Sequence, residues 1–143
     1  MAEGNGEALG WLNELVESVR RIHADILETS GGLAGEHEGK LYGAVARPFH
    51  MAFGQFVFPS SYSRCAALFH GIIAGHIFVD GNKRTASMLC ASMIEALEDD
   101  VSEPSSLQMR MLGELAVHTA QGGVSVDDVA FWIERIFAPR GSA

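Results

Sequence analysis

The chain has 143 residues, of which 48% are hydrophobic and 20% are charged. This length and composition are typical of one folded domain and exclude a disordered chain. Asp and Glu together number 18 against 10 for Lys and Arg, which gives a formal net charge of −8. This balance argues against non-specific nucleic-acid binding, because such binding depends on clustered Lys and Arg.

Both ends of the chain are predicted to be flexible. Residues 1–8 are rich in Gly and Glu, and residues 139–143 follow the last helical pattern. Between them, residues 9–138 are expected to form a single helical domain. No apolar run reaches the roughly 18 residues of a membrane span, and the acidic start of the chain lacks the design of a signal peptide. We therefore expect a cytoplasmic protein.

The first predicted helix covers residues 9–28 and carries a single apolar stripe at helical spacing. Gly31 and Gly32 favour its end, because glycine readily adopts the left-handed conformation of a helix C-cap. A polar loop follows at residues 32–40. Its Glu-His-Glu run at residues 36–38 can be interpreted as a metal site, but a solvated loop is the favoured interpretation.

Residues 41–56 mix apolar side chains at largely helical spacing, and Pro48 indicates a helix start or a kink among them. The next predicted helix follows Pro59, with Ser60 or Ser61 as its N-cap. Four phenylalanines precede it and are most simply interpreted as core residues, although their edge can also hold an adenine ring. They are Phe49, Phe53, Phe56 and Phe58.

Three more helices are predicted in the second half of the chain. Residues 83–97 are apolar on nearly all sides, which indicates the central helix of a bundle. Ser105 with Gln108, and Ser125 with Asp128, have the spacing of capping boxes, and each begins a helix. The last helix is expected to turn five side chains inward: Val129, Trp132, Ile133, Ile136 and Phe137. No strand-like alternation appears, so we expect a compact all-α bundle of about six helices.

Two cysteines lie in these apolar helical stretches. Cys65 and Cys90 have no CxxC spacing and no cluster of His around them. We expect both to be reduced, buried core residues rather than metal ligands or a disulfide.

The chemistry of the chain is concentrated in the loop between its two most apolar helices, at residues 76–84. A helix that begins here attracts anions, since its first N–H groups are unpaired. Gly81 and Asn82 tolerate the backbone angles of a tight anion-binding turn. Lys83 and Arg84 add two cations, although cations in a first helical turn oppose the helix dipole. That unfavourable placement indicates a function in phosphate or nucleotide binding.

Two further side chains complete a set suited to phosphoryl or nucleotidyl transfer to an alcohol. Asp80 is placed to hold Mg²⁺, which proteins bind through one or two carboxylates together with substrate phosphates. His76 suits removal of the hydroxyl proton, because its ordinary pKa lies near neutrality. Each residue also has a plainer interpretation: His76 as a structural histidine, and Asp80 as a helix cap.

Over residues 76–86 the sequence reads His-x-Phe-x-Asp-Gly-Asn-Lys-Arg-Thr-Ala. This motif resembles the signature of the Fic/Doc family, and specifically its Doc (death on curing) branch, with the resemblance covering residues 12–138. Relatives that transfer AMP usually have Gly at the position of Lys83 and Arg at that of Ser87. The resemblance therefore implies a Mg²⁺-dependent toxin kinase that moves the γ-phosphate of ATP to a Ser or Thr hydroxyl. In that reaction His76, Lys83 and Arg84 are the expected catalytic residues.

The same resemblance implies partners. The target is expected to be a translation factor such as elongation factor Tu, aligned against a flap in the region of residues 32–40. Neither Glu3-Gly4 nor Glu38-Gly39 fits the inhibitory motif that some Fic proteins carry, so a separate antitoxin is expected. Three alternatives stay open: AMP or other nucleotidyl transfer to a protein, transfer to a small molecule, and a module that binds a nucleotide or partner without turnover.

Overall fold

A computed structural model describes residues 2–139 of the chain. Within these residues it contains six α-helices, one short 3₁₀ helix and one small hairpin, so the predicted all-α bundle is confirmed. In chain order the elements are α1 (Ala2–Ser30), α2 (Leu41–Ala46), η1 (Arg47–Phe49), β1 (Met51–Ala52), β2 (Gln55–Phe56), α3 (Ser61–Ala74), α4 (Asn82–Leu97), α5 (Ser106–Gln121) and α6 (Val126–Phe137).

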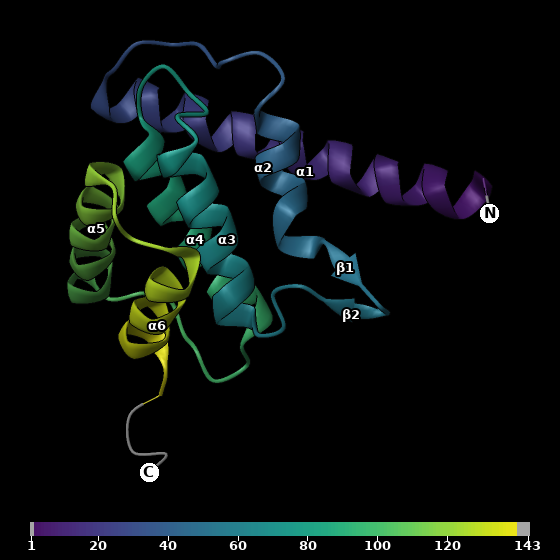
Figure 1. The fold of residues 1–143 in the computed structure, drawn as a ribbon. Helices are drawn as coiled ribbons and strands as arrows, with labels where there is room; N and C mark the ends of the chain where they lie inside the picture. Colours follow the sequence, from purple (N-terminus) through teal and green to yellow (C-terminus); the bar gives the residue numbers. More distant parts are fainter. Residues whose placement is uncertain (1, 140–143) are drawn as a thin grey trace.

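The centre of the bundle is the pair α3 and α4, which pack against each other along their length. Helices α5 and α6 cover one side of this pair, whereas α1 and α2 lie at the end that carries the α3–α4 loop (Figure 1). Phe69 and Ile72 from α3 and Ile94 from α4 are completely buried. The site predicted from the sequence therefore lies at the end of a closely packed helix pair, in contact with α1.

Side-chain caps fix where the later helices begin. The capping boxes predicted for Ser105 with Gln108 and for Ser125 with Asp128 are both present. Ser60, rather than Ser61, caps α3. The first helix begins at Ala2 and not at Leu9. The predicted flexibility of residues 1–8 stays a prediction, and residues 140–143 lie outside the described part of the chain.

The phenylalanine run forms a hairpin, so its interpretation as core is wrong. Phe53 and Gly54 both have positive φ angles, of 53° and 78°, and make the two-residue turn between β1 and β2. The hairpin points away from the bundle (Figure 1), and the Phe53 side chain is fully exposed. Phe49 and Phe58 are only half-buried.

One expectation for the helix faces is corrected and another is confirmed. Trp132 does not lie on the inner face of α6, because its side chain is 51% exposed, while the other four predicted residues are buried. Trp132 instead borders a gap between α5 and α6 on their outer side. Helix α4 is the central helix that its pattern predicts, since it packs against α3, α5 and α1, and Met88 is among its exposed side chains.

The cysteine prediction is confirmed, since Cys65 and Cys90 are buried free thiols. A hydrogen bond of the protonated Cys90 thiol with Cys65, together with burial, raises the pKa of Cys90 well above its ordinary value. No helix in the described residues has the length and hydropathy that a membrane crossing requires.

Candidate active site

His76 lies just beyond α3, in a left-handed backbone conformation with φ of 47°. Positive φ is uncommon for residues other than glycine and is found most often where the surrounding structure imposes it. The two residues that follow His76, Ile77 and Phe78, have buried side chains, which fix the backbone of the loop on that side. His76 itself is exposed, and its imidazole has no hydrogen-bond partner in the described part of the chain. Both ring nitrogens are therefore without a partner among the described residues.

Asn82 closes the motif loop on itself. Its side-chain amide donates to the carbonyl of Phe78 at 2.8 Å and accepts from the N–H of the same residue at 2.9 Å. Both ends of the amide are used in this pair of bonds. The side chain thus shapes the loop, which leaves the second amide N–H and the backbone N–H of Asn82 as donors for a phosphate.

Gly81 makes the turn into α4 with φ of 82°, as its residue type predicts. A Cβ atom at this position would lie 3.3 Å from Leu27 Cδ2 on α1, so the turn is pressed against that helix. The N–H groups of Asn82, Lys83 and Arg84 follow, and none has an acceptor among the described residues. Three free donors at the positive end of a helix form a site for an anion such as phosphate.

Asp80 joins the motif loop to the loop that follows α1. Its carboxylate accepts the N–H of Leu33 at 3.1 Å and the N–H of Gly81 at 2.9 Å. The bond from Leu33 lowers the pKa of Asp80 most, and the bond from Gly81 lowers it further. The positive charges of the nearby Arg84 and Lys83 add to the effect. The carboxylate is therefore ionised at neutral pH.

The Asp80 carboxylate can serve as one ligand of the predicted Mg²⁺, but the other ligands have to come from substrate phosphates and water. The described residues contain no cluster of three or more His, Cys, Asp or Glu side chains that could hold a metal ion. Asp80 nevertheless offers two hard oxygen atoms on a side chain that is 46% exposed. Mg²⁺ commonly takes one carboxylate and completes its shell with phosphate oxygens and water.

The two cations of the motif differ in their surroundings. The Arg84 guanidinium donates to Ser30 Oγ and to the carbonyl of Gly31, the latter at 2.9 Å, and lies 3.9 Å from the Asp80 carboxylate. It ties the start of α4 to the end of α1. Lys83 is exposed and forms no ion pair within the described residues. Lys83 is therefore the cation that is free to bind a ligand.

The polar loop at residues 32–40 lies beside the motif. The N–H of His37 donates to the carbonyl of Ile77 at 2.8 Å, and the N–H of Val79 donates to that of Gly35 at 2.9 Å. The Glu36 carboxylate accepts two bonds from the guanidinium of Arg20, which lowers the pKa of Glu36. Since Glu36 is paired in this way, the loop is held by α1 and by the motif. Its predicted use as a flap for the target stays a prediction.

His23 was not among the residues predicted from the sequence. This side chain on α1 is only 6% exposed, and its Nε2 lies 2.7 Å from the carbonyl oxygen of Asp80. Because a carbonyl can only accept, Nε2 carries the proton. The ring also stacks on Phe78. A histidine within the apolar stripe of residues 9–28 was the available signal, but nothing in the sequence near it indicates a partner 57 residues away.

A cavity of about 490 Å³ opens beside Lys83 and Arg84. It lies between the end of α1, the first turns of α4 and the middle of α5, with Met88 and Met109 among its apolar walls. Ser87 also borders it, with its hydroxyl donating to the carbonyl of Lys83 at 2.8 Å. The volume is in the range of small-molecule sites.

Comparison with known proteins agrees with this geometry. The model of the Fic/DOC family matches residues 11–94, which run from α1 to α4 and include the whole motif loop. The chain belongs to the Fic/DOC family. A curated member of similar sequence is the protein named Toxin Doc from Mycolicibacterium smegmatis, with 41% identity over 68 residues. That match covers 43% of this chain and 52% of the relative, so the chain spans about half of the relative's length.

Proposed function

We propose that this Fic/DOC chain is a Doc-like toxin kinase, which transfers the γ-phosphoryl group of ATP to a Ser or Thr hydroxyl of a protein. The observation that carries the proposal is the position of Lys83. Its ammonium group is free of ion pairs in the described residues, and Lys83 is one of the three first residues of α4, whose backbone N–H groups have no acceptor there. A cation and a helix N-terminus together stabilise the charge of a phosphoryl group in transfer.

In this reaction the target hydroxyl oxygen forms a bond to the γ-phosphorus, and the bond from that phosphorus to the β-phosphate oxygen breaks to release ADP. His76 accepts the hydroxyl proton, for which its exposed, unbonded ring is suited. Lys83 and the N–H groups of α4 bind the phosphoryl oxygens. Asp80 holds Mg²⁺ together with the phosphates, and the bound ion supplies further neutralisation of their charge.

Arg84 has a different part in this account from the one expected from the sequence. Its guanidinium already bonds Ser30 and Gly31. We therefore propose that Arg84 contributes to catalysis by holding α1 against α4, with its remaining N–H groups turned to the phosphates.

Nucleotidyl transfer is the second candidate, favoured by the cavity beside Lys83, which is large enough for a nucleotide. Two residues count against it. Lys83 occupies the place where AMP-transferring relatives have Gly, and Ser87, where they have Arg, turns its hydroxyl back to the α4 backbone. Without that second guanidinium the chain has one fewer group for the nucleotide's inner phosphates.

The biological role that we propose rests on the resemblance to Doc and on the name of the relative, Toxin Doc. The target would be a translation factor such as elongation factor Tu, modified in the cytoplasm so that growth stops. A separate antitoxin would then be needed for viable cells. Strong expression of the lone chain should arrest growth, and His76→Ala should relieve the arrest; unimpaired growth with the intact chain would count against the role as a toxin.

The chemistry is tested with labelled ATP in two parallel reactions. Purified protein, Mg²⁺ and a set of translation factors are incubated with ATP labelled either in its γ-phosphate or in its α-phosphate. The proposal expects label on a protein only from γ-labelled ATP, and loss of that label in His76→Ala and in Lys83→Ala. Label from α-labelled ATP would instead support nucleotidyl transfer.

A further inference from the structure

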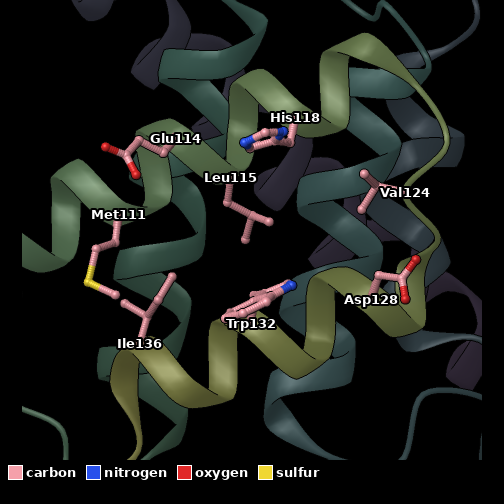
Figure 2. A pocket seen from close by; sticks show the side chains of 8 residues that line it. All are labelled: Met111, Glu114, Leu115, His118, Val124, Asp128, Trp132 and Ile136. Carbon is pink, nitrogen blue, oxygen red and sulfur yellow. The ribbon is translucent and has the colours of Figure 1, made fainter.

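A second hollow lies on the outer side of the bundle, between α5 and α6, with a volume of about 530 Å³ (Figure 2). Its floor is apolar and consists of Leu115 from α5 and Ile136 from α6, both buried. Trp132 projects from α6 into the space between the two helices, and Met111 borders it on α5 (Figure 2). We name this hollow, formed by these four residues and the acids described below, the α5–α6 groove.

The groove leaves large apolar side chains in contact with water. Trp132 is 51% exposed and Met111 is 39% exposed, whereas Val129 and Ile133 of α6 are completely buried. Clustered exposed apolar side chains in a hollow are typical of binding surfaces. Tryptophan supplies a large rigid contact area, and methionine adapts to the shape of a partner. A partner bound in the groove would therefore bury the exposed apolar surface of Trp132 and Met111.

The charges around the groove indicate what kind of partner covers it. Glu114 on α5 and Asp128 on α6 stand at its edges (Figure 2), and no Lys or Arg of the described chain lines it. Hydrogen bonds from the backbone and side chain of Ser125 lower the pKa of Asp128, so its carboxylate is ionised at neutral pH. His118 is the remaining titratable group of the lining. The edges therefore favour a positively charged occupant.

A second copy of this chain fits the groove poorly. In a symmetric pair the acids of both copies would face one another, and each copy carries a formal net charge of −8. A partner with apolar side chains flanked by Lys or Arg meets both the floor and the edges. The apolar floor alone would suit either a second copy of the chain or another apolar partner, and the acidic edges favour the positively charged partner.

We propose that the α5–α6 groove binds an amphipathic, positively charged helix of a partner protein. The apolar face of that helix packs on Trp132 and Leu115, and its Lys or Arg residues meet Glu114 and Asp128. Along α5 the lining runs from Met111 to His118, a rise of about 10 Å or two helical turns. Anchors at positions i, i+3 or i+4, and i+7 of the partner helix match that length.

This groove is separate from the proposed active site. The cavity beside Lys83 is bordered by Met109 and Gly113 of α5, and the two hollows share no lining residue. A partner in the groove therefore leaves the nucleotide site open. The inference goes beyond the proposed function and stands whether or not the chain is a kinase.

The test uses Trp132 as its own reporter. Trp11→Phe removes the other tryptophan, so that fluorescence comes from the groove. The probe is a synthetic amphipathic helix of about 15 residues, with Leu on one face and Lys on the other, and its twin has Glu in place of Lys. We expect the Lys peptide to shift the Trp132 emission to the blue in a saturable manner, and the Glu peptide to leave it unchanged.

Two variants with the same change of charge separate the groove from general attraction to an acidic protein. Glu114→Lys alters the edge of the groove, whereas Glu95→Lys alters an exposed acid on α4. The first should weaken binding about tenfold or more, and the second less than about twofold. With a dye-labelled peptide, Trp132→Ser should weaken binding to a similar degree as Glu114→Lys.

Three outcomes would overturn the proposal. Equal weakening by Glu95→Lys would mean that the peptide senses net charge alone. A blue shift that appears without peptide as the protein concentration rises would mean that the groove pairs with a second copy. The absence of saturable binding by the Lys peptide would mean that the groove is not a docking site for such helices.

Discussion

The imidazole of His23 lies flat against the phenyl ring of Phe78, with ring centroids 3.8 Å apart and planes 8° from parallel. The same imidazole donates from Nε2 to the carbonyl of Asp80 at 2.7 Å. A buried residue of α1 therefore holds two positions of the motif loop at once. One face of α1 continues this support, since Leu27 lies beside the Gly81 turn and Ser30 bonds Arg84.

The first prediction concerns this support. His23→Phe keeps an aromatic ring on Phe78 but removes the N–H, which leaves the Asp80 carbonyl without its donor. We expect a loss of about 1–3 kcal/mol in the free energy of unfolding and weaker ATP binding, measured by chemical denaturation and calorimetry. Val129→Ala, in the core on α6, is the control: it should lower stability without changing ATP affinity. Equal losses of affinity in both variants would show that His23 matters only for stability.

The second prediction separates the two neighbours Asn82 and Lys83. Asn82→Ala removes both bonds to Phe78 and should lower the free energy of unfolding by about 1–3 kcal/mol. Lys83→Ala removes an exposed side chain and should change it by less than about 0.5 kcal/mol. Group transfer should fall in both variants. A Lys83→Ala protein that unfolds at much lower denaturant, or that retains full activity, would contradict the assignment of Lys83 as a phosphate-binding residue.

A third prediction compares two glycines with the same backbone angle. Gly81 and Gly39 both have φ of 82°, but a Cβ at Gly81 would press on Leu27, whereas Gly39 faces open space. Gly39→Ala should cost about 1 kcal/mol from backbone strain alone. Gly81→Ala should cost more, because its methyl group also meets α1. Thermal and chemical unfolding of the pair measure the difference, and equal costs would argue that the turn is not pressed against α1.

The fourth prediction is a dependence on pH that arises from Asp80. Its pKa in the folded protein is lower than the ordinary value of about 4. The stabilisation from its bonds to Leu33 and Gly81 is therefore fully present above pH ~4 and is lost as the pH falls through the lower, folded value. Asp80→Asn should make the free energy of unfolding less steeply dependent on pH in the acidic range. The same slope in both proteins would mean that other carboxylates account for acid unfolding.

The sequence predicted well those features that depend on neighbouring residues. Ser105 and Ser125 cap their helices because each capping box is complete within four residues of chain. The turn at Gly81 and the start of α4 were predicted for the same reason, since glycine suits the left-handed turn before a helix. The motif therefore indicated the loop, its anion-binding end and the residues to test.

The features that the sequence did not predict depend on contacts between distant segments. The partner of His23 is 57 residues away, and the bonds of Arg84 to Ser30 and Gly31 cross from α4 to α1. Phe53 and Trp132 look like core residues by type, but a hairpin turn and the gap beside α5 leave them exposed. Hydrophobicity shows what a side chain favours, and only the packing shows whether a neighbour is there to cover it.

The central claim is that His76 and Lys83 direct the γ-phosphoryl group of ATP to a protein hydroxyl. The most direct measurement is the intact mass of candidate translation factors after incubation with this protein, Mg²⁺ and ATP, beside a His76→Ala control. We predict a gain of about 80 Da, the mass of one phosphoryl group, that disappears in the control. A gain of about 329 Da, the mass of one AMP group, would contradict the claim and establish nucleotidyl transfer in its place.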